Sequence, residues 1–182
     1  MKTLLLLTLF GFLLLNPGSE ARAESATELL RKSREAIGLL YATNPEAEVL
    51  GRSAAAVLIF PEVRKGGLGI AVQVGEGTLF RRLHPVGYFN ITSISGGLDL
   101  GVQKIGYALF FMDEDALGYF RASGGFEVGT APAIVTPGEG VIGGLSTTTL
   151  QRGIHAFSFN PQGLMVSLGL QATKISEIRP SK

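Results

Sequence analysis

The stretch KGGLGIAVQVGEGTLFRR, residues 65–82, decides how this chain folds. It places five glycines among short apolar runs and ends on two arginines. A phosphate-binding loop needs G-x-G-x-x-G or G-x-x-x-x-G-K-[ST] before a helix, because the loop and the helix N-terminus aim backbone N–H groups at the anion. These glycines match neither spacing, and no helix is expected after them. A nucleotide site is therefore disfavoured here.

The same stretch instead predicts a β-hairpin. Gly75-Glu76-Gly77-Thr78 separates two apolar runs, so we expect the turn at Glu76-Gly77, with Val72 opposite Arg81 and Ala71 opposite Arg82. Large aliphatic residues at alternate positions make one face of the hairpin apolar: Leu68, Ile70, Val72 and Val74. The opposite face carries little side chain, at Gly69 and Ala71, which lets another element pack closely.

Three helices are expected around this sheet. SATELLRKSREAIGLLYATNP has an apolar stripe at helical periodicity, and Ser25 and Glu28 stand at the spacing of a capping box. Asn44-Pro45 ends this helix and begins a short second one, PEAEVLGRSA. DEDALGYFRASGG predicts a third short helix, because its acidic first turn suits the helix dipole.

The remaining segments predict further strands. GLDLGVQKIGYALFFM is expected to form a pair broken near Gly106, and a last hairpin is expected across residues 160–163. FEVGTAPAIV contains a proline and predicts an edge strand. The expected fold is α+β: an N-terminal amphipathic helix and a short second helix pack on an antiparallel glycine-rich sheet, or on a partly closed barrel, with one further short helix.

Residues 1–23 have the three parts of a secretory signal peptide. Lys2 precedes an apolar run over residues 4–15, and Ala21-Arg22-Ala23 forms a cleavage site before Glu24. The run is shorter than the roughly 20 residues of a membrane-spanning helix. We expect cleavage and a single domain over residues 24–182, periplasmic or secreted and peripheral on a membrane where it binds one. An uncleaved N-terminal anchor is the alternative.

Composition and motifs disfavour several functions. Without residues 1–23 the chain has 14 basic and 14 acidic residues, whereas general nucleic-acid binding wants a strongly basic domain. There is no cysteine, so disulfides, a lipid-modified cysteine and a cysteine nucleophile are excluded. His84 and His155 lie in different expected strands, and no G-x-S-x-G occurs. Residues 113–115 fit helix capping better than a metal site. No enzyme activity, cofactor or metal is expected.

Six basic residues form the candidate site: Arg31, Lys32, Arg34, Arg64, Lys65 and Arg82. The first three lie on the first helix, the next two in an expected loop after Pro61, and the last on the return strand, sharing a face with His84. Basic residues near an anionic membrane each contribute about 1 kcal/mol. Scattered solvated charge is the alternative. The first helix either docks on the sheet or lies in a membrane interface.

Three stretches resemble the SYLF domain family: AAAVLIFPEVRKGGLGIAVQVGEGTLFRR, SGGLDLGVQKIGYALFFM and SGGFEVGTAP. The resemblance covers about residues 26–178. It implies lipid binding, which in eukaryotic members includes phosphoinositides; some fungal members also bind and bundle actin. It also places Arg31, Lys32, Arg34, Arg64 and Lys65 where members of the family contact membranes. The tryptophan often found after the first hairpin and the closing aromatic-aromatic-Gly segment are missing.

Taken together, the sequence predicts an exported, non-enzymatic lipid-binding protein. It would contact anionic phospholipid headgroups through its N-terminal helix and a basic loop. One alternative is a structural or protein-interaction module of the cell envelope, with a protein partner and no lipid ligand. A hydrolase with an unconventional site is another.

Overall fold

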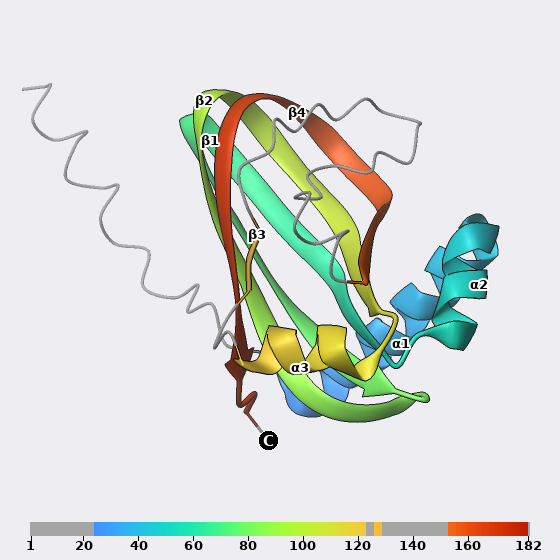
Figure 1. Cartoon of the computed structure of the whole chain (residues 1–182). Helices are drawn as coiled ribbons and strands as arrows, with labels where there is room; N and C mark the ends of the chain where they lie inside the picture. The colour runs from blue at the N-terminus through green and yellow to red at the C-terminus, as the bar shows by residue number, and fades with distance from the viewer. Residues whose placement is uncertain (1–23, 123–125, 129–152, 182) are drawn as a thin grey trace, which may run out of the picture.

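The computed structural model describes residues 24–122, 126–128 and 153–181, and it has an α+β fold (Figure 1). Its strands pair antiparallel in the order β1-β2-β4-β3, so among the described strands β1 and β3 are the edges and the sheet is open. The strands are β1 (Ala56–Arg81), β2 (His84–Phe111), β3 (Phe126–Val128) and β4 (Ile154–Ile178). The helices are α1 (Ala26–Thr43), α2 (Pro45–Ser53) and α3 (Glu114–Ala122).

The three predicted helices are confirmed, and each begins at a side-chain oxygen. Such an oxygen accepts a hydrogen bond from a backbone N–H that the first turn leaves unpaired. The accepting residues are Ser25 for α1, Asn44 for α2 and Asp113 for α3. Pro45 stands in the first turn of α2, where its missing N–H costs nothing. Among the described strands, the edge position expected of the strand at residue 126 is also confirmed, while Pro132 lies outside the described residues.

The predicted hairpin turns inside the strands are wrong. β1 runs without a turn through residues 75–78, and β2 likewise passes through Gly106. Val72 therefore pairs with Ile94 and not with Arg81. β4 continues through residues 160–163, where positive φ values at Asn160 (50°) and Gly163 (91°) accompany a register shift against β2. The glycine- and asparagine-rich signal there marks an irregularity in a strand and not its end.

The turn that joins β1 to β2 instead lies at Arg82 and Leu83. Both residues adopt positive φ, 46° and 68°, which a two-residue hairpin turn of type I′ requires. Non-glycine residues rarely adopt this conformation, so sequence rules do not favour the position. The long partner ladder from Leu79 down to Ile70 overrides that local preference.

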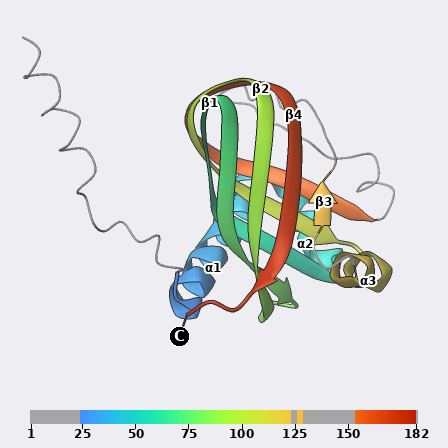
Figure 2. The same cartoon turned by 90° about the vertical axis from the view of Figure 1, so that its left-hand side faces the viewer.

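The long strands fold back on themselves at the end away from α3 (Figures 1 and 2). In β1 the fold occurs at Gly69, whose φ is 86°, and residues 96–100 of β2 lie opposite it across a register shift. We call residues 68–70 and 96–100 the tip. The two arms of β1 then lie in contact: a Cβ on Gly77 would stand 2.5 Å from the carbonyl oxygen of Ile59.

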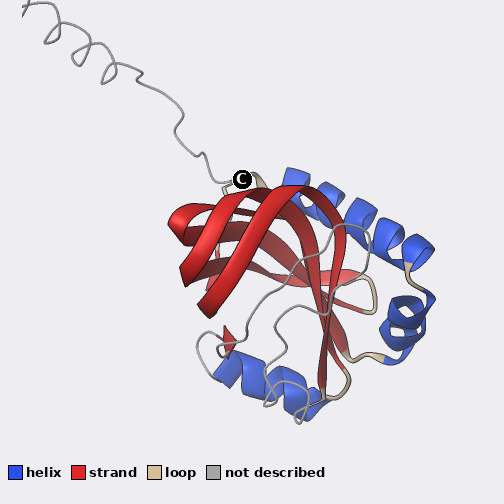
Figure 3. Ribbon diagram, turned by 90° about the horizontal axis from the view of Figure 1, so that it is seen from above, coloured by secondary structure: helices blue, strands red, loops and turns tan. Residues whose placement is uncertain are grey.

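Two apolar clusters hold the arms and helices together. One joins the inner faces of the arms to α3, and the other joins an outer face to α1 and α2; Figure 3 shows two helices along one side of the strands and the third on another. Fully buried members include Phe60, Leu79, Phe111 and Phe120 in the first cluster and Leu40, Ile59 and Phe110 in the second. This packing fixes α1 beside the arms of β1.

Candidate functional site

A groove of about 660 Å³ runs between α1 and the sheet. Its volume falls within the roughly 300–1,000 Å³ of small-molecule sites. The lining combines charged with aliphatic side chains and includes Lys32 and Leu39 of α1 together with Glu62, Arg64 and Val74 of β1. Residues from two distant parts of the sequence thus meet at one hollow.

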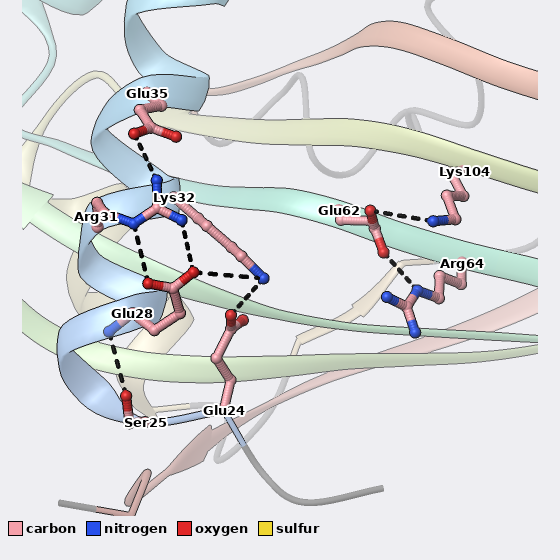
Figure 4. Close-up of polar contacts among 9 residues, drawn as sticks. All are labelled: Glu24, Ser25, Glu28, Arg31, Lys32, Glu35, Glu62, Arg64 and Lys104. Atoms are coloured by element: carbon pink, nitrogen blue, oxygen red, sulfur yellow. Dashed lines mark hydrogen bonds and ion pairs between the residues drawn. The ribbon is translucent and has the colours of Figure 1, made fainter. Parts of the chain in front are cut away.

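The groove brings together two of the six predicted basic residues, Lys32 and Arg64. Each has an acidic partner (Figure 4). Lys32 Nζ lies 2.5 Å from Glu24 Oε1. Arg64 donates to Glu62, and Lys104 Nζ also lies 3.5 Å from Glu62 Oε2. Both cations are therefore present, but each is held by a carboxylate.

Glu62 is the central charge of this arrangement. Partial burial pushes its pKa upward, but the hydrogen bond from Arg64 and the positive charges of Arg64 and Lys104 outweigh burial, so the pKa lies below its ordinary value. Glu62 consequently remains ionised at neutral pH. The groove lining also contains Glu24, Glu35 and Glu76, so its carboxylates outnumber its two cations, Lys32 and Arg64.

Arg31 and Arg34 lie on α1 but outside the groove lining. Arg31 bonds Glu28 at 2.5 Å and Glu35 at 2.6 Å. These hydrogen bonds raise the pKa of Arg31, and the bond to Arg31 lowers that of Glu28. Arg34 is exposed, with no ion-pair partner among the residues that the structure covers. Of the α1 cations, Arg34 has the freest access to a ligand in solvent.

Lys65 faces the interior, on the opposite side of the strand from Arg64. The predicted basic loop is wrong, because both residues lie within β1, where neighbouring side chains point to opposite faces. Lys65 Nζ lies 3.3 Å from Asp99 Oδ1, and the two side chains are only 8% and 0% exposed. In this conformation Lys65 cannot reach a headgroup at the surface.

Arg82 is exposed in the β1–β2 turn, at the opposite end of its arm from the tip. It does not line the groove. The structure therefore gathers Lys32 and Arg64, leaves Arg31 and Arg34 elsewhere on the same helix, buries Lys65 and separates Arg82. The six residues do not form one patch.

An apolar surface lies next to the groove, and its exposure was not predicted from the sequence. We call it the tip surface: Leu68, Ile70, Val72 and Val74 of β1 with Ile94, Leu100 and Val102 of β2, all substantially exposed. The alternation of aliphatic residues in β1 predicted this apolar face. Periodicity shows which residues share a face, but not whether another element covers it. Val74 belongs to both the tip surface and the groove lining.

Within the described part of the chain, no group of three or more histidine or acidic side chains is placed to hold a metal ion. None of the helices described is both long and apolar enough to cross a membrane.

Comparison with models of known protein families finds no match for this chain. A search of curated proteins likewise finds no significantly similar sequence.

Proposed function

We propose that this chain is an exported, non-enzymatic lipid-binding protein that contacts anionic phospholipid headgroups through α1 and the part of β1 around Arg64. The observation that carries the proposal is the continuity of the groove with the tip surface through Val74. Lys32 and Arg64 offer positive charge at one side of this boundary, and aliphatic side chains lie at the other. A phospholipid joins an anionic headgroup to hydrocarbon, so it matches both halves.

A lipid phosphate would have to compete with the groove's carboxylates for its cations. Exposed ion pairs such as Arg64–Glu62 contribute roughly 0–1 kcal/mol, so a lipid phosphate can replace the carboxylate at little cost. Glu62 competes with phosphate for both Arg64 and Lys104. It therefore limits the affinity of the site for anionic headgroups.

This competition gives a sharp test by co-sedimentation of residues 24–182 with vesicles containing phosphatidylglycerol, at low salt where electrostatic attraction is strongest. Replacing Lys32 and Arg64 together by alanine should weaken binding, roughly fivefold for each cation lost if each contributes about 1 kcal/mol. Glu62→Gln should strengthen it, because Arg64 and Lys104 lose their shared carboxylate.

The matched control is Arg52→Ala. Arg52 also forms an exposed ion pair on a helix, with Glu48 at 2.6 Å, but it lies outside the groove. Its replacement should leave binding unchanged. Absence of binding to anionic vesicles at low salt would refute the proposed function. Equal vesicle binding by all three variants would show that the groove does not take part in it.

The remaining parts of the proposal rest on the sequence. The resemblance to the SYLF family supports lipid binding and, with it, a partly closed, glycine-rich sheet. The signal-peptide pattern supports a periplasmic or secreted domain over residues 24–182, peripheral on the membrane. Mass spectrometry of the mature N-terminus in the native host tests export, with Glu24 expected as the first residue.

A second candidate is a cell-envelope module that binds a protein and no lipid. The tip surface favours it as well, since contiguous exposed apolar side chains often mark protein interfaces. A stoichiometric complex from envelope extracts, together with no vesicle binding, would select this candidate over the first.

A further inference from the structure

The tip surface is made of side chains that are neighbours across two strands. Leu68 pairs with Leu100, and Val72 pairs with Ile94. Exposure is high, reaching 82% at Leu68 and 67% at Val102. Single exposed aliphatic residues are normal on soluble proteins, whereas contiguous groups mark surfaces that bind something apolar.

The inner face of the same strand segments is polar and buried. It carries Lys65, Ser95, Asp99 and Gln103, and beside them Ser93 and Thr173 share a hydrogen bond of 2.7 Å. A sheet with one face in water normally places its apolar side chains inward and its polar side chains outward. Near the tip the order is reversed, so the outer face is suited to an apolar medium.

Two cations border the tip surface on the outer face of one arm. Arg64 and Lys104 are directly paired across β1 and β2, and both are exposed. Leu68 and Leu100 belong to the tip and form a cross-strand pair four residues further along the strands, about 13 Å away at roughly 3.3 Å per residue. On the other arm, Glu76 and Asn90 form a polar cross-strand pair two residues beyond Val74, on the side away from the tip.

From this arrangement we propose that the tip inserts into the hydrocarbon layer of a lipid bilayer, with Arg64 and Lys104 at the level of the phosphates. The inference rests on the proposed function and specifies how the protein meets the membrane. A bilayer presents anionic phosphates outside its hydrocarbon layer. The protein has the matching order, because its cations come first and its aliphatic side chains follow toward the tip. The roughly 13 Å between them is less than about 15 Å, half the thickness of the hydrocarbon layer, so the tip reaches into one leaflet without crossing the bilayer.

Site-specific labelling tests insertion directly, and the absence of native cysteine makes single-cysteine variants simple. An environment-sensitive fluorophore is attached at Leu68→Cys and, as a control, at Asp115→Cys, an exposed position on α3 at the far end of the molecule. Vesicles contain phosphatidylglycerol and phosphatidylcholine, with or without a quencher on the acyl chains. The label at position 68 should shift to the blue and be quenched, and the label at position 115 should do neither.

A second measurement uses unlabelled protein at high salt, where electrostatic attraction is screened. The double variant Leu68→Gln with Val102→Gln should bind vesicles at least about tenfold more weakly, because two aliphatic side chains no longer leave water. The matched control is Val49→Gln with Leu83→Gln. These residues are 66% and 72% exposed but lie outside the tip surface.

The possible failures are distinguishable. If the protein sediments with anionic vesicles while the label at position 68 stays in water, insertion is refuted and the proposed function stands. If the protein binds no vesicles, both are refuted. If the tip variant turns a lipid-free oligomer into a monomer and leaves vesicle binding unchanged, the tip surface joins copies of this chain and insertion is refuted.

Discussion

Single glycines allow the two arms of β1 to touch. A Cβ on Gly77 would lie 2.5 Å from the carbonyl oxygen of Ile59 and 2.6 Å from a ring carbon of Phe60. A Cβ on Gly75 would lie 2.8 Å from the carbonyl oxygen of Glu62. Backbone oxygen atoms cannot move aside as a flexible side chain can. The close approach of the arms therefore depends on hydrogen in place of a methyl group.

We accordingly expect Gly77→Ala to lower the free energy of unfolding, by about 1–3 kcal/mol as in other overpacked interiors. Gly38→Ala is the matched control, because a Cβ there meets nothing within 4 Å and the residue lies inside α1. Both changes restrict the unfolded chain similarly. The control should gain up to about 1 kcal/mol of helix propensity. Urea unfolding followed by circular dichroism distinguishes the two, and equal stabilities would contradict contact between the arms.

The partners of charged residues were only partly predictable. Helix caps at Ser25 and Asn44 follow from local spacing, so the sequence identifies them. The burial of Lys65 against Asp99 depends on the fold at the tip, which brings a residue of β1 to a residue far along the chain. No local pattern shows such a pair. For this reason the sequence could not show which of the six predicted cations lie together.

At the scale of elements, α1 docks on the outer face of the sheet. Sequence periodicity left open whether its apolar stripe meets the sheet or a membrane. The structure buries Leu29 and Leu40 completely, and the Ser33 hydroxyl donates to Thr78 Oγ1 at 2.9 Å in the interface. This polar contact fixes the position of the helix along β1, because a shifted helix would leave both hydroxyl groups buried without each other.

Ser33→Ala should therefore destabilise the protein by about 1–3 kcal/mol, the cost of leaving a buried polar partner unpaired. Adding Thr78→Val should recover part of that loss, since the second change removes the orphaned hydroxyl. The free energies of unfolding of the two single variants and the double variant measure the coupling. Additive losses would contradict the bond, and stronger vesicle binding by Ser33→Ala would show that α1 acts on the membrane after leaving the sheet.

The strands show why turn prediction failed where helix prediction succeeded. Gly75-Glu76-Gly77 has the composition of a hairpin turn, but its glycines serve contact between the arms instead. Both uses need a residue without a side chain. A sequence pattern therefore cannot separate them, whereas a helix cap acts only on the neighbouring turn.

Across the whole molecule, apolar and polar side chains are distributed unequally between the two ends of the sheet. The end next to the helices has an apolar interior with Phe60, Phe110 and Phe111 fully buried. Toward the tip the interior becomes polar and the exterior apolar. The proposed membrane contact and the aromatic core therefore lie at different ends, so we expect substitutions on the tip surface to leave the core intact.

The two ends of the described chain also meet at the helical end of the molecule. The C-terminal residues pass beside the start of α1 (Figure 2). The Ala26 N–H donates to the carbonyl oxygen of Ser181 at 3.0 Å, and Ser25 forms an isolated parallel bridge with Ser181. The first turn of α1 is thus held by its own cap and also by the distant end of the chain.

Deleting residues 179–182 should release this first turn. The Ala26 amide would lose its acceptor, so its hydrogen exchange should become faster. Loss of this backbone hydrogen bond should lower the free energy of unfolding by about 0.5–1.5 kcal/mol. Tm should fall with it, because each kcal/mol corresponds to roughly 2–4 °C at this chain length. Arg179→Ala, an exposed change that keeps the backbone of the tail, should leave both quantities unaltered. Unchanged exchange at Ala26 after the deletion would show that the cap at Ser25 alone holds the start of α1.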